Sequence, residues 1–460
     1  MSFSPDLSET RFGCGLSPVI AAPGSVEAML AGLDRPDDMA TRFPMLSYSV
    51  FIERHQQDLK LKKQLKEASG AKADDLKTQI RAINRESQHD RQQSAVQTVL
   101  RWSQTGQGFR ERLARFWGDH FTVVGKSALP ASVVSTYIDE AIRPHLSGSF
   151  GNMLVAVTTH PMMLQYLNQK GSVGPGSRFA LKGDKSLGLN ENLAREVMEL
   201  HTLGVGAAYT QDDVRQLAEL FTGMGVNEQG TFVFRPNRAE PGAETVLGHR
   251  YGGDPAQFAA VEQALQDLAV HPSTANHIAR KLVVHFVSDT PDPALVDHVA
   301  ARYRETGGDL RAVYGALLEH PAAWTDAPGN VKPGFDFIAS ACRGLALGAE
   351  AMAPLQPKQI NQLFMVPLTK MGQEWQKPSG PNGWPEEDQA WITPQGLSAR
   401  IDWALTVPGR LRPELPDPRL FVTQVLGEGA PESVRFAAGA AETQAEAVAL
   451  VLASPAFQRR

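Results

Sequence analysis

Cysteine is almost absent from this chain of 460 residues, which contains only Cys14 and Cys342. Neither belongs to a Cys-x-x-Cys pair, so the sequence indicates neither a zinc site built from thiolates nor a redox dithiol. A disulfide between the two is one interpretation. Two buried free thiols are the favoured one, because free cysteine is among the most buried residue types.

Long apolar runs and an excess of positive charge are also missing. No run approaches the ~18–20 apolar residues that a membrane-spanning helix needs, so we expect no transmembrane segment. Lys and Arg number 45 against 50 Asp and Glu, and the net charge is -5. This argues against a nucleic-acid binder, because non-specific phosphate affinity comes from a basic surface. The first residues lack a basic start followed by an apolar core, which predicts a cytoplasmic location.

The familiar catalytic motifs are absent as well. There is no Gly-x-Ser-x-Gly elbow, no Walker loop, no His-Glu-x-x-His, and no Gly-x-Gly-x-x-Gly after a strand. The chain therefore has no nucleotide or flavin motif, and its cofactor and metal content stay unknown from the sequence. Ser149 is flanked by glycines, but no strand leads into it, so a loop residue is favoured over a nucleophile.

What the sequence does have is a succession of helical patterns, in a composition typical of globular proteins. From about Glu53 to Gln93, a highly charged stretch carries two runs of apolar residues at helical spacing, separated by Gly70. This pattern predicts an inserted hairpin of two antiparallel helices. A hairpin packed on its own domain is favoured over an arm that binds a partner, because charge on an outer helix face is the default.

The segment GVNEQGTFVFRP is the one convincing indication of β-structure, because Thr231, Val233 and Arg235 alternate with phenylalanines after a turn. We therefore predict a mainly α fold, a large orthogonal or bundle-like array of helices with one small β-hairpin. Residues 1–460 are expected to form a single large helical domain, with residues 330–460 as a C-terminal helical subregion.

Three His-Pro pairs each precede a helical pattern, at His160, His271 and His320. Proline fits the first helical turn, because its missing N–H would be unbonded there. The preceding histidine then lies near the cap in an extended conformation, so a structural role is favoured for all three.

The most informative stretch is residues 188–223, GLNENLAREVMELHTLGVGAAYTQDDVRQLAELFTG. Asn190 predicts a helix start and Gly204 its end, because asparagine is a good N-cap and glycine accepts a left-handed conformation. Thr210 and Asp213 resemble a capping box that begins a second helix. Two consecutive helices are expected here.

Glu196 falls beside the apolar stripe of the first of these helices, and two interpretations of it stay open. In one, it belongs to a polar pocket able to do acid–base work or bind a hard metal. In the other, which is favoured, it is a buried ion-pair partner that fixes helix packing. The Glu-x-x-His spacing of di-iron proteins is absent. The pocket candidates are Glu196, Glu199, His201 and His120 as catalytic residues, and Asn192, Arg195, Asp119 and His160 as binding residues.

Two other groups of polar residues have structural alternatives. Asp119 and His120 invite an acid–base interpretation, but His120 shares a helix face with aromatic residues, and a neutral histidine in an aromatic core is favoured. His277, Lys281 and His285 are spaced four apart, and a cation between two histidines makes a poor metal site. An exposed helix face is predicted for these three.

Several sequence blocks occur in one order along the chain, TRFGCGLSP, RFWGDHF, IRPHLSGSFGNM, NENLAREVMELHTLGVG, HPSTANHIARKL, MGQEWQKPSGPNGWP and LASPAFQRR. With these blocks the sequence resembles the bacterial family labelled domain of unknown function 1800, over nearly the whole chain. The charged stretch at about residues 53–93 looks like an insertion relative to that family, and Asp119 stands where asparagine is usual.

The resemblance implies a mostly α-helical fold and no established activity. Genes of the family often neighbour those of a sulfatase-like family, which implies a partner protein. Many relatives look exported, which differs from the cytoplasmic location predicted for this chain. Asn168-Gln169 stands where the family often has Asp-Asn, and Arg238-Ala239-Glu240 where it often has a His-Asp pair. If those groups serve a metal in relatives, this chain has lost or changed that site.

Two functions follow as hypotheses. An assembly or partner-binding protein, with a sulfatase-like protein as the candidate partner, is somewhat favoured by the missing cofactor motifs and the charged stretch. The alternative is a hydrolase-type or metal-dependent enzyme with a Glu/His polar pocket, so whether the chain is an enzyme stays open.

Overall fold

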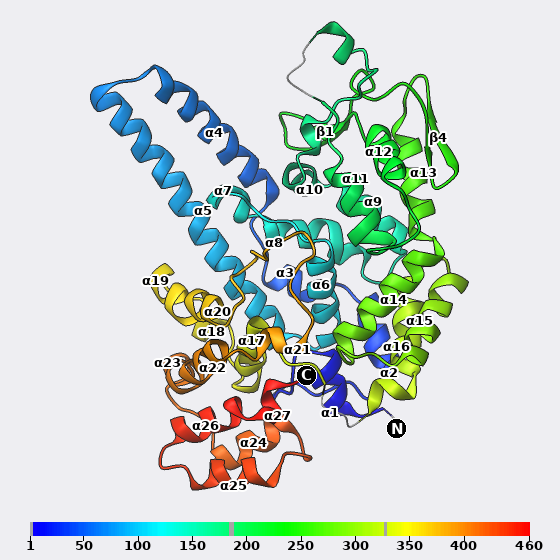
Figure 1. Cartoon of the computed structure of the whole chain (residues 1–460). Coiled ribbons are helices and arrows are strands. Elements are labelled where there is room, and N and C mark those ends of the chain that lie inside the picture. The colour runs from blue at the N-terminus through cyan, green and yellow to red at the C-terminus, as the bar shows by residue number, and fades with distance from the viewer. Residues whose placement is uncertain (1–2, 184–187, 326–328) are drawn as a thin grey trace.

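The computed structural model describes residues 3–183, 188–325 and 329–460. It confirms a mainly α-helical fold in which the β-structure of the described residues is two small antiparallel hairpins (Figure 1). The predicted hairpin pairs β1 (Met224–Val226) with β2 (Phe232–Phe234). A second hairpin, β3 (Gly242–Val246) with β4 (His249–Gly253), was not predicted, because its sequence is rich in glycine and lacks a clear apolar alternation.

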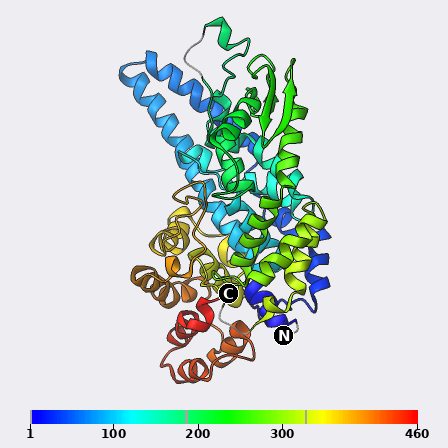
Figure 2. The ribbon, with the colours of Figure 1, turned by 45° about the vertical axis from the view of Figure 1, so that its right-hand side comes forward.

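Two long helices project from the body of the molecule, α4 (Tyr48–Glu67) and α5 (Gly70–Gln104) (Figure 1). Gly70 makes the turn between them at a φ of 58°, a conformation that glycine adopts without steric cost. The hairpin stands away from the body in the rotated view as well (Figure 2). The far end of α5 is buried, so this helix anchors the projection in the core.

One apolar core is built mainly from elements before residue 325. Its helices include an amphipathic one, α6, whose sequence places Leu113, Phe116 and Trp117 on the buried face. The helices of this part, besides α4 and α5, are α1 (Pro5–Leu7), α2 (Val26–Asp34), α3 (Asp38–Arg42), α6 (Gly108–His120), α7 (Ala128–Ala131), α8 (Val134–Tyr137), α9 (Phe150–Thr159), α10 (Pro161–Tyr166), α11 (Asn192–Glu196), α12 (Gln211–Leu220), α13 (Phe258–Ala269), α14 (Pro272–Phe286), α15 (Pro293–Glu305) and α16 (Leu310–Glu319).

A second apolar core joins the C-terminal helices to the end of α5, which contributes Val96, Val99 and Trp102. Its helices are α17 (Gly334–Gly344), α18 (Ala349–Met352), α19 (Pro357–Ile360), α20 (Val366–Lys370), α21 (Asp388–Trp391), α22 (Pro394–Thr406), α23 (Pro408–Leu411), α24 (Pro418–Leu426), α25 (Glu432–Ala440), α26 (Gln444–Ala453) and α27 (Pro455–Gln458). The bounds of the inserted hairpin and of the C-terminal subregion as separate units stay predictions.

The three histidines of the His-Pro pairs cap their helices. In each of His160, His271 and His320, Nδ1 accepts a hydrogen bond from the main-chain N–H two residues later, at 3.1, 3.1 and 3.2 Å. The proline supplies the first helical residue in all three. The predicted structural role is therefore confirmed, because each imidazole satisfies an N–H that a helix start leaves free.

Both cysteines are buried free thiols, as the favoured interpretation predicted. Burial raises the pKa of Cys14 and of Cys342, so both thiols stay protonated at neutral pH. Across the described ranges, no helix is both long enough and apolar enough to cross a membrane.

Candidate functional site

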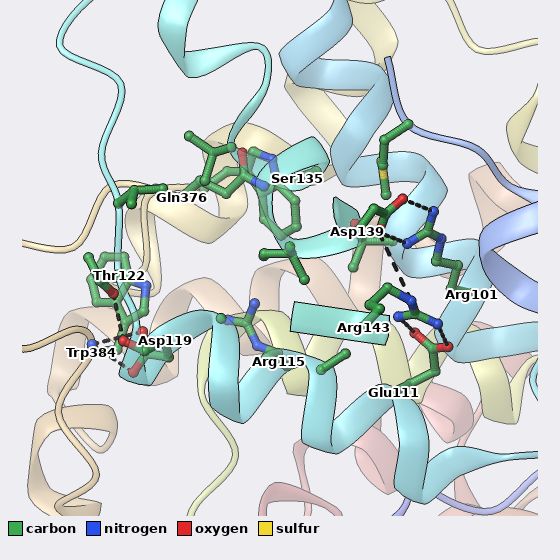
Figure 3. A pocket seen from close by; sticks show the side chains of 18 of the residues that line it. Arg101, Glu111, Arg115, Asp119, Thr122, Ser135, Asp139, Arg143, Gln376 and Trp384 are labelled. Carbon is green, nitrogen blue, oxygen red and sulfur yellow. Dashed lines mark hydrogen bonds and ion pairs between the residues drawn. The ribbon is translucent and has the colours of Figure 1, made fainter. Parts of the chain in front are cut away.

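A pocket opens beside helix α6, and its open space is about 720 Å³ including the mouth (Figure 3). Three charged residues of α6 line it, Glu111, Arg115 and Asp119. They are spaced four residues apart, so they share one face of the helix, next to the face that enters the core. The loop between α20 and α21 contributes Trp375 and Trp384 to another part of the lining.

Asp119 lies at one end of this pocket, at the C-terminal turn of α6. The main-chain N–H of Trp384 donates to both of its carboxylate oxygens, at 3.0 Å each (Figure 3). Gly383 makes this approach possible, because it has a φ of 78° and a Cβ there would lie 2.6 Å from Asp119 Oδ2. The carboxyl group is thus held by backbone and has no cation within ion-pair distance among the described residues.

Burial raises the pKa of Asp119 to about 7. The negative charge of Glu386 contributes to this rise, while the positive charges of Lys281 and Arg115 oppose it. The hydrogen bond from Trp384 also favours the ionised form, but it does not outweigh the loss of solvation. With this pKa, Asp119 changes between its protonated and ionised forms near neutral pH, whereas an aspartate with the usual pKa of 3.8 is fully ionised there.

Four other charged residues that line the pocket form two pairs (Figure 3). Arg101 donates to both carboxylate oxygens of Asp139, at 2.6 and 2.8 Å. Arg143 likewise donates to both oxygens of Glu111, at 2.9 and 2.6 Å. Bidentate pairs of this kind hold the side chains rigidly, so they shape the pocket and leave little capacity for further partners.

A second, smaller pocket lies behind the first, and Arg115, Asp119 and Trp384 line both. Its centre is a buried ion cluster around Asp336 on α17, which forms ion pairs with Arg112, Arg115 and Arg460. Although burial opposes ionisation, these arginines hold the pKa of Asp336 far below its usual range. Asp336 is therefore ionised at neutral pH.

The ion cluster continues to Glu386, which has His285 on one oxygen at 2.7 Å and Arg460 on the other at 3.3 Å. Burial opposes ionisation, yet these partners lower the pKa of Glu386 to about 2. The prediction of an exposed face for His277, Lys281 and His285 is wrong, since His285 is only 7% exposed and the other two are partly buried. The helix α14 carries them inward because it lies between the core and the loop that ends at α21.

The structure places two of the predicted catalytic histidines together in the aromatic core. His120 is 2% exposed and His201 is 1% exposed, and their ring centroids are 6.2 Å apart. Nε2 of His120 lies 3.2 Å from the main-chain oxygen of His201. Burial lowers the pKa of His201 to about 3 and that of His120 well below its usual range. Both imidazoles are neutral, as expected for histidines in an aromatic core.

The predicted pocket candidates between residues 192 and 199 lie apart from this pocket. Glu196 and Glu199 are half-buried neighbours on one helical segment, and Asn192 is exposed. Burial raises the pKa of Glu196, and the charge of Glu199 raises it further. Arg195 pairs with Glu191 at 3.1 Å instead of with either of them. A π-helical turn at Val197–Thr202 follows α11 and rotates His201 away from these carboxylates.

His160, the remaining candidate, serves as the cap of α10 and lies among other partners. Its Nε2 is 3.2 Å from Glu140 Oε2, and its ring packs edge-on against Tyr48 and Tyr137. The described parts of the chain contain no group of three or more His, Cys, Asp or Glu side chains arranged to hold a metal ion. The candidate residues therefore lie in separate places, and Asp119 is the one that lines the pocket.

Sequence reasoning missed Arg115, Trp384 and Glu386 as neighbours of Asp119. One signal was present, because Glu111, Arg115 and Asp119 repeat every four residues beside an apolar helix face. The loop residues had no such signal, since only the folded chain brings the segment around residue 384 against α6.

Comparisons with known proteins give one match. No curated protein and no solved structure matches the chain. The model of one family, described as protein of unknown function (DUF1800), matches residues 11–459. The chain therefore belongs to the DUF1800 family of proteins of unknown function.

Proposed function

We propose that this protein is a hydrolase-type enzyme in which Asp119 transfers the proton. The observation that carries the proposal is a carboxyl group in a pocket, aimed by the main-chain N–H of Trp384, with a pKa of about 7. A group with its pKa near the working pH gives the best balance between being in the right protonation state and having enough driving force for proton transfer.

The other two acids of the pocket are unsuited to this role. Glu111 and Asp139 are each held in a bidentate ion pair, which occupies their carboxylate oxygens. Asp119 instead accepts hydrogen bonds from one backbone group. In the proposed reaction Asp119 takes a proton from a water molecule as the water oxygen bonds to the substrate. The bond to the leaving group then breaks, and Asp119 returns the proton to that group. Arg115 lies within the same pocket.

The earlier candidates keep a supporting role in this proposal. His120, next in sequence to Asp119, and His201 are proposed to hold the C-terminal turn of α6 in place. The pair Glu196 and Glu199, with Asn192 and Arg195, stays a proposed second polar site on the surface of the helical body. The proposed role of His160 is purely structural, as the N-terminal cap of α10.

The pH profile of hydrolysis tests the proposal. The full chain is assayed with a panel of p-nitrophenyl esters, phosphates and glycosides between pH 5 and pH 9. Because Asp119 acts as a base only when ionised, kcat/KM for a turned-over substrate is expected to rise and level off above a midpoint near pH 7. A rate that is constant across this range contradicts the assignment of Asp119.

Assembly is the second candidate function, and two surface features favour it. The hairpin of α4 and α5 projects from the body and offers a long charged face (Figure 1). Separately, Ile401, Leu405 and Leu450 line a groove between α22 and α26 and are each nearly half exposed. Exposed apolar side chains gathered in one place are typical of protein contacts. A sulfatase-like protein is the proposed partner, and a cytoplasmic location is part of the same proposal.

Native mass measurement tests this second function. The chain is measured alone and mixed with the sulfatase-like protein whose gene lies nearest to its own. A 1:1 complex that is lost in the L405E variant is expected if the groove forms the contact, because a buried carboxylate without a partner is costly. Two independent species at micromolar concentrations count against assembly.

A further inference from the structure

Arg115 is a fixed cation with open hydrogen-bonding capacity. Its guanidinium group lies over the ring of Phe335, 4.4 Å from the centroid, and its Nε is 3.4 Å from Asp336 Oδ1. Its two terminal nitrogens make no hydrogen bond with any residue that the structure describes, and the side chain is 23% exposed. Figure 3 shows this guanidinium between Asp119 and the paired side chains of Arg143 and Glu111.

Asp336 does not neutralise Arg115, because it is shared with two other arginines. Arg112 lies 3.1 Å from Asp336 Oδ2, and Arg460 binds the same oxygen. One carboxylate therefore faces three guanidinium groups. Arginine is suited to planar groups with two oxygens, so the open edge of Arg115 fits a carboxylate or a phosphate.

The surroundings of Arg115 carry a surplus of positive charge. The acids of the cluster are Asp336 and Glu386, together with Asp119 when it is ionised. They are outnumbered by its cations, which are Arg112, Arg115, Lys281, Arg400 and Arg460, together with Lys332 when it is protonated. Burial and the neighbouring arginines lower the pKa of Lys332 to about 7 even though Asp336 opposes the shift. A negative group brought into the pocket would offset this surplus.

We infer that the pocket takes a small molecule with an oxyanion group, a carboxylate or a phosphate, and that Arg115 binds this group beside Asp119. The remaining lining suits an apolar or aromatic body, since Trp102, Trp375 and Trp384 contribute to it. This inference rests on the proposed function, because it assigns a substrate class to the same pocket.

Binding of simple anions tests the inference without any turnover. The full chain is titrated at pH 8 with inorganic phosphate and, separately, with acetate, at an ionic strength kept constant with sodium chloride. Calorimetry and the fluorescence of the pocket tryptophans report binding. R115Q is expected to weaken saturable binding of at least one anion by about tenfold or more, because a charge-assisted pair is lost. R115K is expected to keep part of the affinity.

D119N supplies a result of opposite sign. Asp119 is largely ionised at pH 8, so the variant removes a negative charge near the bound anion and is expected to tighten binding. R302Q is the matched control, because Arg302 lies on the exposed surface of α15 and its ion-pair partner among the described residues is Glu305. Its affinity for the anion is expected to equal that of the wild type.

Two outcomes overturn the inference. One is a lack of saturable binding for both anions, and the other is an R115Q variant that binds them as tightly as the wild type. The proposed function fails separately. If R115Q weakens anion binding and D119N keeps its turnover, the oxyanion site stands and the catalytic role of Asp119 is lost. If D119N loses turnover and R115Q binds the anions normally, the catalytic role of Asp119 stands and the oxyanion site is lost.

Discussion

Replacing Asp119 by asparagine is expected to lower kcat by about 10²–10⁴-fold on any substrate that the protein hydrolyses, because this range is typical of a lost acid–base group. The amide is nearly isosteric with the carboxyl group, and its oxygen can still accept the N–H of Trp384. The fold is therefore expected to stay intact, while the proton acceptor is gone. Steady-state kinetics at pH 8 measure the loss.

Stability is expected to change in the opposite direction in this variant. The pKa of Asp119 is raised to about 7 from a usual 3.8, so ionisation opposes folding. The contribution of this group to stability is greatest below about pH 4 and is lost as the pH rises through 7. D119N does not ionise, and it is expected to unfold at a higher urea concentration than the wild type at pH 8.

The control for both measurements is D297N, because Asp297 is exposed on α15 and does not line the pocket. It is expected to match the wild type in rate and in stability. A D119N variant that is as active as the wild type, or that is strongly destabilised at pH 8, would refute the role given to Asp119. The second result would identify the carboxylate as a structural group instead.

Replacing Arg343 by methionine is expected to destabilise the protein by about 3–5 kcal/mol, the range for breaking a buried ion pair from one side. Arg343 on α17 is fully buried. It donates to the main-chain oxygens of Gly15, Trp102 and Thr105 at 2.6, 3.0 and 2.8 Å, and to Glu9 Oε2 at 3.1 Å. Methionine fills similar space, so the loss comes from the acceptors that remain buried without a donor.

Urea unfolding of the R343M variant measures this effect, and the Glu9 carboxyl supplies a second observable. Burial raises the pKa of Glu9 even with Arg343 present. Because Arg343 opposes this rise, the pKa of Glu9 is expected to be higher still in the R343M variant. R302M is the control, because Arg302 is 44% exposed and its ion pair lies at the surface. If the free energy of unfolding of R343M falls by less than about 1 kcal/mol, the expected role of Arg343 is contradicted, because water then replaces its hydrogen bonds almost fully.

Local structure followed closely from the sequence. The His-Pro caps and the capping box of Thr210 with Asp213 form as expected, because each depends on residues two or three positions apart. Gly70 and Gly204 adopt positive φ where helices end or turn. Two local features were not anticipated. The π-helical turn at Val197–Thr202 was missed because a spacing of about 100° per residue assumes a regular α-helix, and the hairpin of β3 with β4 was missed because its strands lack a clear apolar alternation.

The site depended on contacts that no short pattern contains. Asp119 and Trp384 lie 265 positions apart in sequence, and Arg112 and Asp336 are separated by 224. The aspartate of the RFWGDHF block was visible, but its raised pKa comes from burial beneath a loop that arrives much later in the chain. The carboxylates of Glu196 and Glu199 were more conspicuous in the sequence, and they lie apart from the pocket that the fold makes.

The ion cluster around Asp336 needs arginines from distant parts of the sequence. Arg112, Asp336 and Arg460 come from widely separated points along the sequence, and a chain is synthesised from its N-terminus. Helix α6 and α17 can therefore meet on the ribosome before Arg460 exists. During that interval the second pocket lacks the guanidinium group that also holds Glu386. The electrostatic field around Asp119 is thus complete only when Arg460 has joined the residues of α6 and α17, and a chain that lacks residue 460 would carry the pocket in an unfinished state.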